Sequence, residues 1–261
     1  MDVMWLLKDF NNFALYTVTD AAINVASVAG IWLIAARFNG IGGMGIYQVL
    51  FMLGYSLMVN GLISTFFSFN VYFISRIIGR GQMDHVLIMP QPVWVTLLTE
   101  GFTPVSGSGV LLSGIGVTTF ALSRIDNLVS VPFVIALVGC IGLSVIISLS
   151  FSFMWGSLAF YSPVGAEEVC TSAGSLSWLS GFPLNGLESV SKYVMLSVLP
   201  IGLYAWFPSM ALMGLSSSLN IALLAFIALA YLSLVLFFFT RGLKHYVKNG
   251  SYRYLDRGHR R

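Results

Sequence analysis

The stretch VPFVIALVGCIGLSVIISLSFSFMWGSLAF, residues 131–160, contains no charged side chain. A helix needs about 20 consecutive apolar residues to cross a hydrocarbon core about 30 Å thick, so this stretch is long enough to span a membrane. Similar uncharged stretches lie on both sides of it, at 21–36, 38–75, 101–123 and 193–240. The sequence therefore predicts a protein that crosses a membrane several times.

The lengths of these stretches predict the number of spans. Segment 193–240 is long enough for two helices hinged near Pro208, whereas each of the other stretches holds one. We therefore predict an all-α polytopic membrane protein with six transmembrane helices, in a single transmembrane domain over residues 1–240. The predicted spans lie at about 16–36, 46–69, 103–123, 131–160, 190–207 and 219–240.

The composition agrees with a membrane protein. Hydrophobic residues make up 57% of the 261-residue chain, charged residues make up 9%, and the mean hydropathy is +0.87. A soluble globular protein has about 25% charged residues, because its surface must be hydrated, so the composition excludes that class. Aromatic residues reach 14%, which also excludes a disordered chain.

The distribution of basic residues predicts that both termini face the cytoplasm, since cytoplasmic segments carry an excess of Lys and Arg. With this orientation, only Arg37 and Arg124 lie outside. The connections 70–102 and 162–190 and a basic cytoplasmic tail at 241–261 lie inside. The eleven basic residues expected inside are Lys8, Arg76, Arg80, Lys192, Arg241, Lys244, Lys248, Arg253, Arg257, Arg260 and Arg261.

Residues 1–15 have the pattern of an amphipathic helix, with polar residues on the face opposite the apolar ones. The apolar residues at helical spacing are Leu6, Leu7, Phe10, Phe13 and Ala14. We expect an interfacial helix that lies along the cytoplasmic surface and leads into the first span. The alternative is a plain extension of that span.

The connection between the second and third spans contains a short helix bounded by helix-breaking residues, in segment 79–92. Gly81 precedes an apolar run from Met83 to Met89, which opens with Asp84 and closes before Pro90. A carboxylate in the first turn suits a helix N-terminus. Because so short a helix cannot fold alone, its apolar side chains need a protein partner or lipid headgroups to cover them. The alternative is an ordinary turn on the membrane surface.

The pattern G-x-M-D-x-x-L-x-x-P in this segment resembles the cytoplasmic loop of ABC-2 type permeases, in the branch of six-span bacterial subunits that are separate from their ATPase. The matching residues are Gly81, Met83, Asp84, Leu87 and Pro90. The sequence FPLNGLESVSKYVMLSVLPIGLYAWFPS, residues 182–209, resembles the region of that branch around its fifth span. Its recurring residues are Pro183, Pro200, Gly202 and Pro208. Met89 departs from the family, which often has a basic residue before the proline.

The resemblance implies a transport pathway formed by two permease subunits, identical or homologous, and driven by two ATP-binding cassette subunits that bind ATP and Mg²⁺. We expect an exporter in the bacterial cytoplasmic (inner) membrane, with import as the alternative direction. Membrane lipids are further expected partners, whereas no nucleic acid, metal or cofactor is expected in this chain. The short helix is then a coupling helix that docks on the ATPase. Its candidate contact residues are Gly81, Met83, Asp84, His85, Leu87, Ile88 and Pro90.

The lysines show that the chain has no ATP-binding P-loop of its own. A P-loop needs Gly immediately before Lys and a hydroxyl residue immediately after it. The residues that precede the four lysines are Leu7, Ser191, Leu243 and Val247. We therefore expect no enzymatic activity here, with ATP hydrolysis on a separate chain.

Polar residues inside the spans are candidates for a substrate pathway or for helix packing. A carboxylate near the cytoplasmic end of the first span is expected to reach water by snorkelling. Serines at every fourth position of the fourth span, and glycines in the third, form ridges that let helices approach closely. The candidate residues are Asp20, Asn24, Asn60, Thr65, Ser144, Ser148 and Ser152.

Two other functions share this composition. An ion-gradient-driven carrier is disfavoured, because no series of acidic residues or histidines lies within the predicted spans. A non-transporting membrane scaffold could have the same number of spans. That function does not explain the short helix between glycine and proline in segment 79–92.

Overall fold

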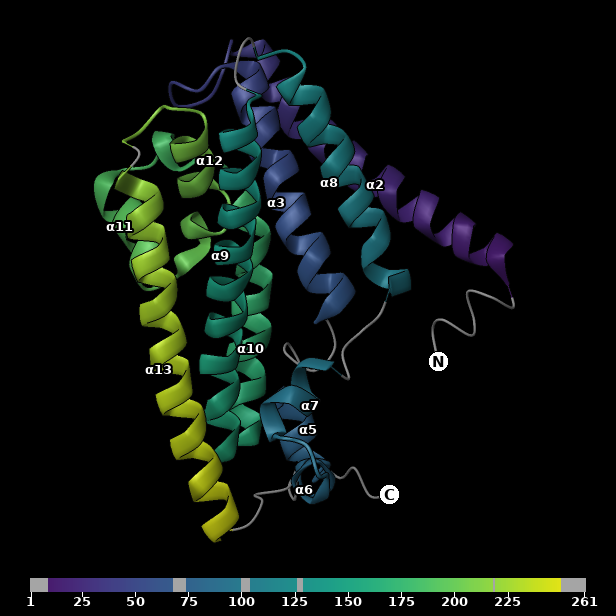
Figure 1. Cartoon of the computed structure of the whole chain (residues 1–261), viewed down its shortest axis with the longest axis vertical. Coiled ribbons are helices and arrows are strands. Elements are labelled where there is room, and N and C mark those ends of the chain that lie inside the picture. The colour runs from purple at the N-terminus through teal and green to yellow at the C-terminus, as the bar shows by residue number, and fades with distance from the viewer. Residues whose placement is uncertain (1–8, 68–73, 100–103, 126–128, 218, 250–261) are drawn as a thin grey trace.

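The computed structural model describes residues 9–67, 74–99, 104–125, 129–217 and 219–249. They form an elongated bundle of helices, with shorter helices gathered at its two ends (Figure 1). We call the end that holds the helices between residues 74 and 99 the inner end. The opposite end, beside the connection 38–45, is the outer end.

Within these described residues, four long apolar helices can each cross a membrane by length and composition. They are α2 (Phe10–Arg37), α3 (Ile46–Phe66), α9 (Val131–Gly156), which the 3-10 helix η1 (Ser157–Phe160) extends, and α13 (Leu219–Asn249). Helix α8 (Pro104–Leu122) is shorter and apolar. These five helices correspond to the first, second, fourth, sixth and third predicted spans. The all-α polytopic class is confirmed, while the number of six crossings stays a prediction.

Helix α10 (Pro163–Ser177) runs from the inner end toward the outer end of the bundle (Figure 1). Near its start, Arg76 Nε donates a hydrogen bond to Glu167 Oε1 at 2.9 Å. Beyond its end, Asn185 Nδ2 donates to the carbonyl oxygen of Gly42 at 2.8 Å. Gly42 precedes α3 and Arg76 follows it, and the 21 residues of α3 are about 31 Å long. The chain from Glu167 to Asn185 therefore runs the full length of α3.

The course of α10 differs from one sequence prediction. Residues 162–190 do not form a connection on one side of the bundle, because α10 makes a fifth passage along it. A search for uncharged stretches misses α10, because two adjacent glutamates lie in its first turns. The long uncharged stretch 193–240 contains most of α13 and most of a bent pair of helices, whose length and composition fit a broken span or a re-entrant loop.

Residues 189–212 form a bent pair of helical segments at the outer end. Helix α11 (Ser189–Ser197) meets the segment Pro200–Leu212, which contains η4 (Pro200–Leu203) and α12 (Trp206–Leu212), at 71°. The helix breaks before Pro200 because proline cannot donate the backbone hydrogen bond that would continue it. Trp206 Nε1 donates to Asn185 Oδ1 at 2.6 Å, which ties the pair to the outer end.

Lys192 also lies at the outer end, which differs from its predicted grouping with the basic residues of the inner end. Its Nζ is 4.7 Å from the centroid of the Trp206 ring. Arg37 is the last residue of α2 and Arg124 follows α8, on the same side. Moving Lys192 to the outer set leaves ten of the thirteen basic residues on the predicted cytoplasmic side, so the excess there remains.

The most extensive helix contact joins α3 and α8, and it depends on glycine. A Cβ added to Gly61 of α3 would lie 2.6 Å from the backbone nitrogen of Leu111. A Cβ added to Gly114 of α8 would lie 2.6 Å from the backbone nitrogen of Met58. Both distances are too short for a real Cβ, so the two backbones are in direct contact. The structure thus confirms close packing through the small residues of the third predicted span.

Two predicted boundaries fall inside helices. Helix α2 is continuous from Phe10, so the described part of the predicted interfacial helix 1–15 shows no break before the first span. Residues 1–8 lie outside the described residues. Helix α13 continues through Asn249, past the predicted start of the basic tail. The remainder of that tail, 250–261, also lies outside the described residues.

Candidate functional site

Three short helices form the inner end of the molecule (Figure 1): α5 (Ile74–Gly79), α6 (Met83–Ile88) and α7 (Val93–Thr99). Between α5 and α6, Gly81 has φ of +73°, a left-handed conformation that residues with a Cβ rarely adopt. Glycine therefore permits the sharp turn that separates the two helices. The structure has a short helix at the position where the sequence predicts one.

One face of α6 is buried in an apolar cluster. Met83 is 0% exposed and Val86 is 5% exposed. We call this set of residues the inner cluster, and it comprises Ile74, Ile77, Ile78, Met83, Val86, Leu97, Ala159, Phe160, Ala166, Phe239 and Tyr246. Tyr246 Oη also donates a hydrogen bond to Asp84 Oδ1 at 2.7 Å. Helix α6 is thus fixed to α5, α10 and α13.

The other face of α6 points away from the molecule. Ile88 is 81% exposed. Leu87, in contrast, is partly buried against the inner cluster. Complete burial of an isoleucine side chain contributes about 1.5–3 kcal/mol, so an apolar groove on a partner would stabilise Ile88. Helix α6 therefore combines a firmly packed base with an apolar tip suited to docking.

The structure separates the predicted contact residues of this segment into two groups. Those that α6 and its flanks expose are Asp84, His85, Ile88 and Pro90. Met83 is buried, and Gly81 and Leu87 are half-buried. The first group faces away from the molecule, whereas the second group packs wholly or partly within it.

Two contacts that hold the inner end were not predicted from the sequence. Arg76 of α5 is bonded to Glu167 of α10, and Asp84 of α6 is bonded to Tyr246 of α13. The partners are 91 and 162 residues apart, so no local spacing could indicate them. Both contacts connect the short helices to long helices of the bundle.

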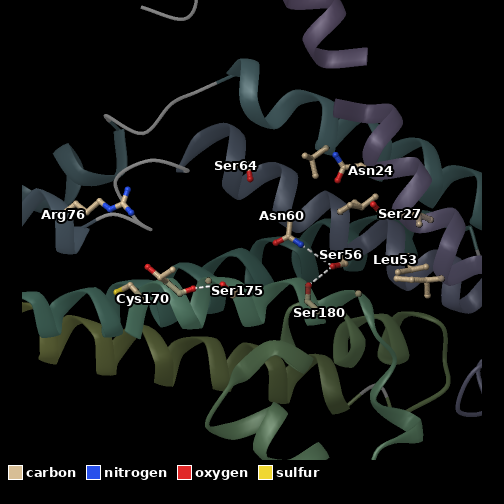
Figure 2. A pocket seen from close by; sticks show the side chains of 17 residues that line it. Asn24, Ser27, Leu53, Ser56, Asn60, Ser64, Arg76, Cys170, Ser175 and Ser180 are labelled. Atoms are coloured by element: carbon tan, nitrogen blue, oxygen red, sulfur yellow. Dashed lines mark hydrogen bonds between the residues drawn. The ribbon is translucent and has the colours of Figure 1, made fainter. Parts of the chain in front are cut away.

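A second candidate site is a cavity of about 510 Å³ between α2, α3 and α10 (Figure 2). Asn24 of α2 and Asn60 of α3, both predicted as pathway candidates, line it. Asn60 Nδ2 donates to Ser56 Oγ at 3.4 Å, and Ser56 Oγ lies 2.9 Å from Ser180 Oγ. Arg76 of α5 lines the cavity at its inner end.

Asp20 lies at the crossing of α2 and α8 and does not line this cavity. A Cβ added to Gly109 would lie 2.7 Å from Asp20 Oδ2 and 2.8 Å from the carbonyl oxygen of Thr17. Asn24 Nδ2 donates to the backbone oxygen of Asp20 at 2.7 Å. The carboxylate is therefore directed at a helix contact, which differs from the expected snorkelling toward water.

The remaining polar candidates also lie outside the lining of the cavity. Thr65 Oγ1 donates to the carbonyl four residues earlier in α3 at 2.7 Å. Ser144 Oγ lies 2.9 Å from Tyr55 Oη, and both side chains are buried. Ser148 is buried and Ser152 is half-buried on the same helix. Their positions support the packing interpretation of the fourth-span ridge.

A family model described as "ABC-2 family transporter protein" matches residues 21–250, which include both the α6 region and the cavity. No curated protein and no solved structure matches the chain. Members of this family are membrane transport components that are not themselves catalytic. The match extends over most of the chain, and this multi-pass membrane protein therefore belongs to the ABC-2 family of transporter proteins.

Proposed function

We propose that this chain is the permease subunit of an ATP-driven exporter in the bacterial inner membrane. Two such subunits, identical or homologous, form the substrate pathway as a dimer. Separate ATP-binding cassette subunits bind ATP and Mg²⁺ and drive transport. Helix α6 is the coupling helix that docks on them. The observation that carries the proposal is the division of α6 into a face buried in the inner cluster and an exposed tip at Ile88.

The contacts of α6 support a mechanical connection between the ATPase and the pathway. Closure of the ATPase dimer would push α6, and the inner cluster would move with it because packed side chains resist compression. The Asp84–Tyr246 hydrogen bond passes the displacement to α13, and the Arg76–Glu167 ion pair passes it to α10. Because α10 lines the cavity, its movement would open or close the pathway.

The direct test is assembly. We expect the purified chain to form a stable complex with an ATP-binding cassette protein from the same genome, and the complex to hydrolyse ATP. The outcome against the proposal is a chain that folds in detergent or nanodiscs and binds no such protein.

The hydrogen bond between Tyr246 and Asp84 gives a test of how α6 is held. In the Tyr246→Phe variant we expect amide hydrogen exchange in residues 83–89 to rise about fivefold, because one hydrogen bond contributes about 1 kcal/mol. Tyr231→Phe is the matched control, since Tyr231 Oη donates to the carbonyl oxygen of Ser197, far from α6. Unchanged exchange at 83–89 in Tyr246→Phe would show that this bond does not hold the helix.

The excess of basic residues toward the inner end supports a cytoplasmic position for that end. Single cysteines in a C140A/C170A background test this orientation. We expect a membrane-impermeant maleimide to label Ser189→Cys on intact cells, and to label Val247→Cys only after permeabilisation. The reverse pattern would overturn the orientation. Labelling of both positions from the same side would overturn the course of α10.

A further inference from the structure

The cavity between α2, α3 and α10 is lined by uncharged hydrogen-bonding groups (Figure 2). Two are the carboxamides of Asn24 and Asn60, on separate helices. Six are hydroxyls, from Ser27, Ser56, Ser64, Thr171, Ser175 and Ser180. In this respect the cavity differs from the bundle core, which consists mainly of apolar side chains.

The charges of the cavity disfavour an ionic ligand. Among its described lining residues no carboxylate is present, so a cation would have no neutralising partner there. Arg76 is the charged residue of this lining, and its Nε lies 2.9 Å from Glu167 Oε1, which offsets its charge. Moving an ion out of water without a partner of opposite charge is energetically unfavourable, because nothing replaces its hydration. A neutral ligand avoids this loss.

The hydrogen bonds of the lining show what it can offer to a ligand. Ser27 Oγ and Ser175 Oγ donate to carbonyls of their own helices at 3.0 and 2.9 Å. A hydroxyl that donates to its backbone retains lone pairs that accept from a ligand. A carboxamide such as Asn60 has two N–H donors and a carbonyl acceptor. The wall therefore suits a ligand that carries both donors and acceptors, as hydroxyl and amide groups do.

Apolar side chains alternate with these polar groups, and they are Val28, Ile31, Leu53, Leu57 and Val110. We propose that the cavity binds an uncharged amphiphile whose polar part carries hydroxyl or amide groups. This inference rests on the proposed transport function, because it assigns the chemical class of the molecule that the pathway carries.

Cys170 provides a reporter of binding that is independent of transport. It lines the cavity, whereas the other cysteine of the chain, Cys140, is 0% exposed on α9. In a Cys140→Ala variant, Cys170 is the remaining thiol. The rate of its modification by N-ethylmaleimide then reports whether the cavity is occupied.

The experiment uses the permease in nanodiscs, alone and in complex with its ATPase, and four probes with the same octyl chain. Octyl glucoside carries hydroxyls, N-octylacetamide carries an amide, and octyltrimethylammonium and octyl sulfate carry opposite charges. All four are compared at equal concentrations below those at which micelles form. We expect the glucoside, the amide or both to slow the modification of Cys170 about fivefold at a probe concentration of four times Kd. Occupancy of the cavity divides the rate by one plus the ratio of probe concentration to Kd. The charged probes should leave the rate unchanged.

Which neutral probe binds more tightly distinguishes a hydroxyl-bearing from an amide-bearing substrate. Equal protection by all four probes, or protection by a charged probe alone, would overturn the proposal. Absence of protection by both neutral probes would also overturn it.

Substitutions in the walls locate the binding. We expect Asn60→Leu to raise Kd of the protecting probe about two- to tenfold, because one hydrogen bond is lost. Asn24→Leu tests the opposite wall, should Asn60→Leu fail to fold. Asn220→Leu, at the start of α13 and outside the cavity, is the matched control. An unchanged Kd in both cavity variants would place the probe elsewhere and refute the inference.

These outcomes separate the inference from the proposed function. A complex that assembles through α6 but shows no protection refutes the ligand class alone. Protection of Cys170 in a chain that binds no ATPase refutes the proposed function alone.

Discussion

In the Ile88→Asp variant, we expect the permease to purify without its ATP-binding cassette subunit. Ile88 is 81% exposed at the tip of α6, and its substitution leaves the buried face of that helix intact. Truncation of a central interface residue often costs 2 kcal/mol or more, which raises Kd at least about 30-fold. Aspartate adds the cost of desolvating a charge in an apolar groove. The affinity of the purified subunits for each other measures the effect.

The control for this variant places the same charge elsewhere at the inner end. Val247 of α13 is 65% exposed, so we expect Val247→Asp to bind the ATPase normally. Leu87→Asp is not a clean test, because Leu87 packs against the inner cluster and its substitution would disturb the fold. Normal affinity of Ile88→Asp would exclude docking through α6. An equal loss of affinity for the ATPase in Ile88→Asp and Val247→Asp would indicate a general effect of negative charge at the inner end.

The short helix at the inner end could be predicted from the sequence because local residues determine it. Gly81 supplies the left-handed turn before the helix, and the proline segment after Ile88 ends it. Which of its side chains face outward could not be predicted. Burial in the inner cluster covers Met83 and leaves Ile88 exposed, and several members of that cluster lie far away in the sequence.

The fifth passage along the bundle shows where hydropathy is insufficient. Helix α10 contains two glutamates and several hydroxyl residues, so it does not have the composition of a lipid-facing helix. It can nevertheless lie within the bundle, because Arg76 pairs with Glu167 and the hydroxyls face a cavity. The same tertiary arrangement explains why the cavity could be only partly predicted. Asn24 and Asn60 stand out in the sequence, whereas Ser56, in a helix that is buried over most of its length, gives no local signal.

The contact between α3 and α8 gives the largest expected effect on stability. Gly114 and Gly116 lie two positions apart on α8, so replacing either by leucine changes intrinsic helix propensity by the same amount. A Cβ at Gly114 would lie 2.6 Å from the backbone nitrogen of Met58 and 2.9 Å from the carbonyl carbon of Leu57. Backbone atoms cannot rotate away as a flexible side chain would, so the two helices must separate.

We therefore expect Gly114→Leu to destabilise the protein by about 3 kcal/mol, at the upper end of overpacking effects, and to lower the midpoint of thermal unfolding by about 6–12 °C. A Cβ at Gly116 would meet no atom within 4 Å, so Gly116→Leu should unfold at or above the wild-type temperature. Thermal unfolding of both variants is followed in the same detergent. Because each variant carries one extra leucine in the same helix, an effect of that leucine on membrane insertion does not enter the difference between their midpoints. Equal midpoints for the two variants would mean that α3 and α8 are not in backbone contact.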